Sequence, residues 1–305
     1  MRPVDAAEPI MTYPCGMNPA ELGFAQRALL GSGTSSVSIR WLGTAGFELT
    51  SGEHTVLFDP YLTRASLSRC VLAPLRPDER LLAQHLPRAD AIILGHTHFD
   101  HALDAPSIAK RTGALVLGSR SAAELCRAQG VPASQIDVVE RPAGSAPVVR
   151  EVGPFHLTFH ASAHSPLLLG RVPFEGEIAD CDAIPMRAEA YLCGAVFGVE
   201  VGVAGKTLFH VGSAEILASM PKLSVDLALL CVAGWTSSAS FPERMMQKLS
   251  PRAVLLSHWD NFLRPLSEGA HALPAMQTGR LVDRLAKVTA DVRVGTLPLL
   301  GELLL

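Results

Sequence analysis

The sequence lacks the features that mark several classes of protein. No uninterrupted apolar run approaches the roughly 18 to 20 residues that span a bilayer, and no basic segment followed by an apolar stretch marks a signal peptide. An excess of basic residues is also missing, because 26 Lys and Arg face 29 Asp and Glu, for a net charge of −3. The charge balance therefore argues against nucleic acid as a partner, and we expect a cytoplasmic protein without a transmembrane segment.

Paired cysteines and aromatic residues are scarce as well. The six cysteines are scattered without any CxxC pair, which excludes a zinc ribbon and a disulfide framework. Aromatic residues make up 6% of the 305 residues, whereas 48% of the chain is hydrophobic. A chain of this length and composition buries a large core built from aliphatic side chains.

Apolar runs of strand length alternate with helical patterns along the chain. This alternation predicts an α/β (α+β) fold in one domain, residues 37–305, in which β-structure comes first. The expected strands are Val37–Leu42, Gly46–Thr50, Thr55–Phe58, Ala91–Leu94, Ala114–Leu117, Ile136–Val139, Lys206–Phe209, Leu227–Cys231 and Ala253–Leu256. The expected helices are Ser121–Gln129, Pro242–Leu249 and Thr278–Val288.

Two segments stand outside this alternation. Residues 1–36 form an N-terminal extension, which the apolar spacing between Pro19 and Leu30 predicts to be helical. Residues 165–189 contain three prolines and follow neither the helical nor the strand period, so we expect an insertion loop. Long irregular loops in compact domains often cover binding sites.

The most informative segment follows the expected strand Ala91–Leu94. It places His96, His98, Asp100 and His101 within six residues, which is the density of a metal site. Neutral imidazole and carboxylate suit Zn²⁺, Mn²⁺ and iron, and the lack of cysteine in the cluster disfavours a closed structural zinc. The cluster therefore predicts an open site that can hold two metals.

These four residues match the HxHxDH motif, so the chain resembles the metallo-β-lactamase superfamily. The other landmarks of that superfamily recur in order as Trp41-Leu42-Gly43-Thr44-Ala45-Gly46, Leu57-Phe58-Asp59-Pro60-Tyr61, Ala163-His164-Ser165, Gly212-Ser213 and Leu256-Ser257-His258-Trp259. In motif style the chain is most similar to the branch of ascorbate-phosphate lactonases and N-acyl-phosphatidylethanolamine phospholipase D. The resemblance implies a four-layer αββα sandwich.

The resemblance also implies a ligand set. The first metal would be bound by His96, His98 and His164, and the second by Asp100, His101 and His258, with Asp100 and His258 also taking catalytic roles. The cofactor would be one or two Zn²⁺ ions, with Mn²⁺ or iron as alternatives, and Asp59 would orient a ligand imidazole from beneath the metals. By its position before Ala105, Asp104 is expected to cap a helix.

The sequence departs from the superfamily at Ser213, where an aspartate usually bridges both metals. A neutral hydroxyl holds two cations less well than a carboxylate, so we expect the second metal to bind less tightly. Three explanations stay open: Glu215 reaches into the site, a bridging hydroxide compensates, or one metal suffices.

The expected function is metal-dependent hydrolysis, in which a metal-bound hydroxide attacks an ester, a lactone or a phosphodiester. The substrate would be a small molecule or a lipid-like compound, since Leu167–Leu169 and Phe174 in the insertion suit an acyl chain. One alternative is a non-haem iron oxidoreductase or dioxygenase of the same fold. Another is a non-catalytic, metal-binding regulatory protein.

Overall fold

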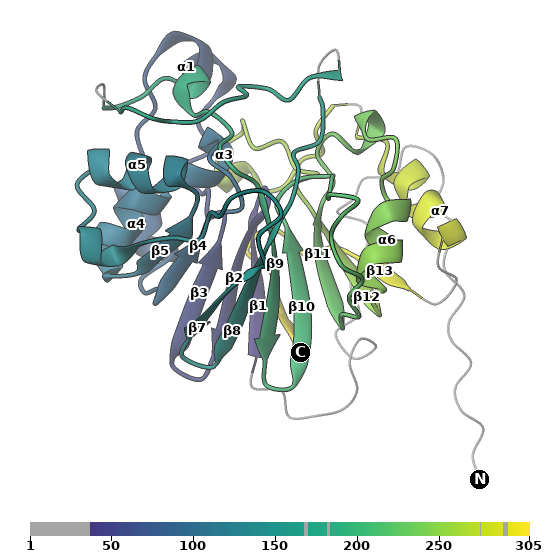
Figure 1. The fold of residues 1–305 in the computed structure, drawn as a ribbon. Coiled ribbons are helices and arrows are strands. Elements are labelled where there is room, and N and C mark those ends of the chain that lie inside the picture. The colour runs from purple at the N-terminus through teal and green to yellow at the C-terminus, as the bar shows by residue number, and fades with distance from the viewer. Residues whose placement is uncertain (1–36, 168–169, 182–183, 275, 289–291) are drawn as a thin grey trace.

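The structure is a computed structural model that describes residues 37–167, 170–181, 184–274, 276–288 and 292–305. Two seven-stranded sheets pack face to face, and helices cover their outer sides (Figure 1). This is a four-layer αββα arrangement, and it confirms the predicted fold class. In the described part of the chain, no helix has the length and apolarity needed to cross a membrane.

The first sheet has the strand order β14-β1-β2-β3-β4-β5-β6. Strands β14 to β3 pair antiparallel, and β3 to β6 pair parallel. Its strands are β1 (Val37–Gly43), β2 (Gly46–Ser51), β3 (His54–Phe58), β4 (Ala91–Ile93), β5 (Leu115–Gly118), β6 (Ile136–Val138) and β14 (Glu302–Leu304).

The second sheet has the order β13-β12-β11-β10-β9-β8-β7 and repeats the same plan. Strands β7 to β10 pair antiparallel, and β10 to β13 pair parallel. Its strands are β7 (Val148–Val152), β8 (Phe155–Ala161), β9 (Phe197–Val203), β10 (Lys206–Val211), β11 (Leu227–Cys231), β12 (Ala253–Ser257) and β13 (Arg293–Gly295).

Helices form the two outer layers (Figure 1). On the side of the first sheet lie α1 (Leu67–Leu72), α2 (Glu79–His85), α3 (Phe99–Ala102), α4 (Ala105–Thr112) and α5 (Arg120–Ala128). On the side of the second sheet lie α6 (Glu243–Leu249) and α7 (Thr278–Val288). Single 3-10 turns lie at η3 (Ala133–Gln135), η5 (Ala188–Ala190), η6 (Trp235–Ser237) and η7 (Leu266–Glu268).

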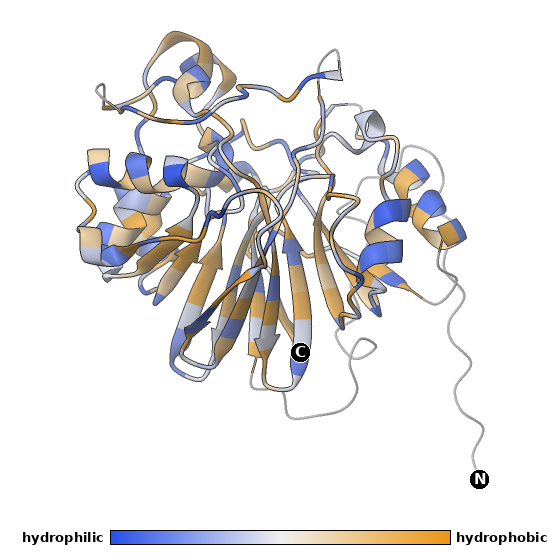
Figure 2. Ribbon diagram, in the orientation of Figure 1, coloured by the Kyte–Doolittle hydropathy of each residue, from blue (hydrophilic) through white to orange (hydrophobic). Residues whose placement is uncertain are grey.

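Two hydrophobic cores hold the layers together. Alternation along β1 sends Val37, Ile39 and Trp41 into the space between the sheets, where residues of the second sheet such as Leu157 and Val199 meet them. The other core lies between the first sheet and its helices and is lined by Leu57, Ile92, Ile108 and Leu125, among others. Figure 2 shows the hydrophobic residues gathered on the strands and the hydrophilic ones on the outer helices.

The sequence predicted most of the buried strands but missed the outer part of the second sheet. Strands β7, β8 and β9 were not expected, whereas α7 has the predicted bounds. The predicted helix in the N-terminal extension lies outside the described residues. Among the described residues of the segment 165–189, regular structure is confined to single 3-10 turns, one of which is η5.

Candidate metal centre

The candidate ligands come from strands that end on the same side of the sandwich. Asp59 follows β3, His96 lies three residues after β4, and His164 follows β8. Ser213 lies two residues after the end of β10, and His258 comes directly after the end of β12. The carboxyl ends of strands are where α/β folds usually bind ligands, because loops there can carry side chains without disturbing the sheet.

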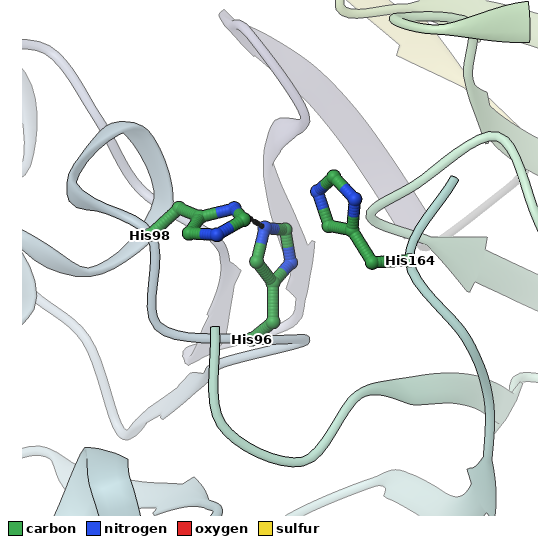
Figure 3. A group of neighbouring side chains, drawn as sticks. All are labelled: His96, His98 and His164. Atoms are coloured by element: carbon green, nitrogen blue, oxygen red, sulfur yellow. Dashed lines mark hydrogen bonds between the residues drawn. The ribbon is translucent and has the colours of Figure 1, made fainter. Parts of the chain in front are cut away.

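The first group comprises His96, His98 and His164, whose ring nitrogens all lie within 4.8 Å of one another. Nε2 of His96 lies 3.1 Å from Nδ1 of His98, as the dashed line in Figure 3 marks. The ring of His164 stands 4.9 Å from that of His96 and 4.7 Å from that of His98, centroid to centroid. The three imidazoles therefore converge on one point from two separate segments of the chain.

The second group comprises Asp100, His101 and His258, and its ligand atoms also lie within 4.8 Å of one another. Oδ2 of Asp100 lies 3.2 Å from Nε2 of His258 and 3.8 Å from Nε2 of His101. The rings of His96 and His101 are 3.8 Å apart, so the two groups are adjacent. The structure thus brings together all six residues that the superfamily motif assigns to the metals.

Asp59 lies beneath both groups and contacts only one of the six residues by a hydrogen bond. Nδ1 of His101 donates to Oδ2 of Asp59 at 2.9 Å, while the backbone N–H of Gly95 donates to Oδ1 at 2.6 Å. A Cβ atom on Gly212 would lie 2.5 Å from Oδ2 of Asp59. Glycine is therefore required at 212 to let the carboxylate approach, and the carboxylate leaves Nε2 of His101 free to bind a metal.

Burial and mutual repulsion keep most of the histidines neutral. Burial, together with the neighbouring histidines, holds the pKa of His96 well below its usual range. Burial and the proximity of His98 lower the pKa of His164 to about 3. Burial also acts to lower the pKa of His101, but the carboxylates of Asp59 and Asp100 outweigh it and raise that pKa.

The donor set fits a divalent metal. Burial would raise the pKa of Asp100, yet the adjacent histidines, His101 first among them, outweigh it and lower that pKa, so this carboxyl is an anion. Hydrogen bonds also fix the tautomers, because Nε2 of His98 donates to Pro173 O at 2.8 Å and Nδ1 of His164 donates to Ser165 O at 2.7 Å. One ring nitrogen of each imidazole is left with a lone pair for a metal, which is the arrangement that zinc and iron sites use.

The structure does not bring Glu215 to the histidines, so the suggestion that it replaces the bridging aspartate is wrong. Its carboxylate accepts from Arg244 at 2.8 Å and from Ser238 at 2.6 Å. The suggestion assumed an extended backbone, whereas the chain bends at residues 212–214, directly after β10. Ser213 itself does face the site.

Asp104 occupies the N-cap position of α4, as expected from its sequence position, but its carboxylate does not cap the helix. Its side chain makes no hydrogen bond to the first turn of that helix. Oδ2 instead accepts from the backbone N–H groups of Leu62 and Thr63 at 2.7 and 2.9 Å. Asp104 therefore anchors the loop that follows β3, and burial raises the pKa of its carboxyl to about 6.

A cavity of about 460 Å³ opens beside the two groups of ligands. Pro173 and Phe174 of the insertion line it, and the hydrogen bond from His98 to Pro173 O ties that insertion to the first group. Trp235, directly after Gly234, lines it as well. Sequence reasoning missed Phe262, Leu273, Pro274 and Met276, which also line the cavity and carry no motif.

Comparisons with known proteins agree with this geometry. A sequence profile described as "Beta-lactamase superfamily domain" matches residues 54–282. A UPF0173 metal-dependent hydrolase of Anaeromyxobacter sp. (strain K) is 29% identical over 234 residues, which cover 73% of this chain and 75% of that protein.

Solved structures share the fold at lower sequence identity. Igni18, a metallo hydrolase of Ignicoccus hospitalis KIN4/I, is 18% identical with a TM-score of 0.52, and the match covers 87% of this chain and 96% of that one. CmlA, a diiron β-hydroxylase of Streptomyces venezuelae, is 16% identical with a TM-score of 0.53, and the match covers 90% of this chain and 55% of CmlA. The profile spans most of the chain and includes its HxHxDH motif, so the chain belongs to the metallo-β-lactamase superfamily.

Proposed function

We propose that this protein is a metal-dependent hydrolase of esters, lactones or phosphodiesters, with zinc as its metal. The observation that carries the proposal is that two adjacent groups converge, His96, His98 and His164 in one and Asp100, His101 and His258 in the other, and that all of these residues except His96 line an open cavity. A site with three protein ligands and an open position gives a bound metal room for water or substrate. The similarity to UPF0173 metal-dependent hydrolases supports the same reaction type.

The chain's own residues would prepare the site in a defined way. His96, His98 and His164 would hold the first metal, and Asp100, His101 and His258 the second. When bound, such a metal lowers the pKa of water to about 7 and polarises the bond under attack. Asp59 keeps the proton of His101 on Nδ1, and Pro173 O keeps that of His98 on Nε2, so each ligand is oriented before a metal binds.

The second site is the weaker one in this proposal. Asp100 is the one carboxylate among the described residues that line the cavity, and Ser213 adds no charge. If the first site alone is filled, the carboxylate of Asp100 and the ring of His258, whose Oδ2 and Nε2 lie 3.2 Å apart, are free to hold the attacking water or the substrate, which gives both a catalytic role. If both are filled, these two residues are ligands.

The proposal includes a position near the ascorbate-phosphate lactonases and N-acyl-phosphatidylethanolamine phospholipase D, which the chain resembles in motif style. A second candidate function is oxidation at non-haem iron, because imidazole and carboxylate also suit iron. The fold shared with the diiron β-hydroxylase CmlA is compatible with it. The identity of the bound metal separates the two functions.

The experiment is to measure metal content by plasma mass spectrometry on protein purified without chelators, together with hydrolysis of ester and phosphodiester substrates. The His98→Ala variant should lose both metal and activity, whereas His156→Ala, an exposed histidine on β8, should lose neither. Two equivalents of zinc would indicate a dinuclear hydrolase, and one a mononuclear hydrolase. Bound iron with no hydrolysis would favour the oxidoreductase, and no metal after reconstitution would contradict both.

A further inference from the structure

The cavity beside the candidate ligands is chemically divided. Its titratable side chains are mainly the histidines and Asp100, while Thr236 and Ser237 add hydroxyls beside Trp235 and most of the remaining wall is apolar. That wall combines Leu167 and Phe174 of the insertion with Trp235, Phe262, Leu273 and Met276. A substrate that fills this space must place its reacting group at the histidines and an apolar group against these neighbouring apolar side chains.

The two insertion side chains are large apolar groups left open to solvent. Leu167 is 38% exposed and Phe174 is 42% exposed. Both side chains nevertheless have contacts that hold them in place. Leu167 packs so closely on the backbone of Gly234 that a Cβ atom added to this glycine would lie 2.5 Å from Cδ2 of Leu167. The ring of Phe174 stands edge-on to the ring of His98, with 6.2 Å between the ring centroids. Exposed apolar groups on a fixed rim are typical of a surface that receives an apolar ligand.

The cavity offers no side-chain cation to an anionic substrate. None of the described residues that line it is lysine or arginine. Two arginines outside the lining are engaged elsewhere, since Arg244 pairs with Glu215 at 2.8 Å and Arg284, which covers the ring of Trp235, pairs with Glu243 at 2.6 Å. Enzymes of phosphoryl transfer usually add arginine or lysine clamps to their metals, so the lining favours an uncharged substrate.

We infer that the substrate is an uncharged carboxylic ester or lactone with an apolar acyl chain, and that Leu167, Phe174 and Trp235 bind this chain. The inference rests on the proposed hydrolase function. In the reaction, the oxygen of water bonds to the acyl carbon and the bond from that carbon to the alkoxy oxygen breaks. One proton of water passes to the alkoxy oxygen, the other is released, and the products are a carboxylate and an alcohol.

The test compares p-nitrophenyl acetate, butyrate and octanoate with bis-p-nitrophenyl phosphate on the metal-loaded protein. We expect kcat/KM to rise about tenfold or more from acetate to octanoate and to exceed that of the phosphodiester. Phe174→Ser should abolish most of this rise. Ile184→Ser is the matched control, because Ile184 is 43% exposed in the same insertion but does not line the cavity, and it should keep the rise.

Binding of unreactive amides separates the inference from the proposed function. Calorimetry on the metal-loaded protein should show octanamide binding at least about tenfold more tightly than acetamide, with the difference lost in Phe174→Ser. Octanamide binding without hydrolysis of any ester would support the apolar subsite and contradict the hydrolase. Equal kcat/KM values for all esters, equal binding of both amides, or preferred cleavage of the phosphodiester would overturn the inference.

Discussion

The hydroxyl of Ser213 accepts a hydrogen bond from the backbone N–H of Ser165 at 2.9 Å, directly beside His164. It also donates to Oγ of Ser165 at 3.2 Å. The residue at the usual bridging position is thus part of the hydrogen-bonding around the first group of ligands. Because Ser213 brings no negative charge, Asp100 is left as the one anion among the six proposed ligands.

Replacing Ser213 with aspartate should therefore strengthen the second metal site. A carboxylate at 213 can still accept from Ser165 and adds a negative charge between the two groups of ligands, so we expect zinc to bind the second site roughly tenfold more tightly or better. Competition with a chromophoric chelator measures this affinity. Ser213→Asn is the control of matched size, and equal zinc affinity in the two variants would contradict the argument.

A second prediction concerns Gly212, whose lack of a side chain lets the Asp59 carboxylate approach. A methyl group at Gly212 would lie 2.5 Å from Oδ2 of Asp59 and would displace it from His101. We expect Gly212→Ala to lower zinc affinity by about 10- to 100-fold, as Asp59→Asn should, because His101 loses the partner that fixes its tautomer. Gly202→Ala is the control, since a Cβ there lies 3.5 Å from its nearest neighbour. Wild-type zinc affinity in Gly212→Ala would refute the role of Asp59.

The parts of the site that were predictable from the sequence are those carried by local motifs. His96, His98, Asp100 and His101 are close in sequence and stay close in space, because α3 begins inside the motif. His164 and His258 could be placed through the superfamily landmarks. The position of Glu215 could not be predicted, because its carboxylate binds Ser238 and Arg244, which are more than 20 residues away in the sequence.

In the fold, too, features marked by the local sequence were predictable, and features that depend on tertiary contacts were not. Strands with buried, continuous apolar runs, such as β11 and β12, were predicted. Strand β7 was missed because it lies at a sheet edge and contains Arg150 and Glu151, which weaken the apolar pattern. The cavity wall was missed for a related reason: Phe262, Leu273 and Met276 come together only through tertiary packing, and nothing in their local sequence marks them.

Asp104 should make stability depend on pH in a measurable way. Burial raises its pKa from 3.8 to about 6, so the folded state holds the proton more tightly than the unfolded chain does. Its ionisation therefore opposes folding, and this contribution to stability falls as the pH rises from about 4 to above 6. Between pH 5 and 7.5 we expect a loss of about 1 kcal/mol that Asp104→Asn does not show. Urea unfolding of both proteins measures it, and parallel pH profiles would count against the buried ionisation.

A buried ion pair behind His258 gives the last prediction. Nη1 of Arg64 lies 2.7 Å from Oδ2 of Asp260, both side chains are 0% exposed, and Oδ1 of Asp260 accepts from Thr44 N at 2.9 Å. Thr44 O in turn accepts from the backbone N–H of His258 at 2.7 Å. The pair therefore fixes the loop that carries this candidate ligand, whose φ of 57° lies in the strained left-handed region.

Removing one partner of the pair should cost more than removing both. Arg64→Met leaves the Asp260 carboxylate buried without its counter-ion, and we expect it to lower the free energy of unfolding by about 3 kcal/mol. The double variant, Arg64→Met with Asp260→Leu, removes the uncompensated charge and should recover part of the lost free energy of unfolding. Its zinc binding at the second site should stay impaired, because the backbone N–H of Thr44 has lost the Asp260 carboxylate as its acceptor. Urea unfolding and zinc titration separate the two effects. If the double variant loses as much free energy of unfolding as the two single variants together, the two charges act independently. Unchanged zinc binding would show that His258 keeps its place without the ion pair.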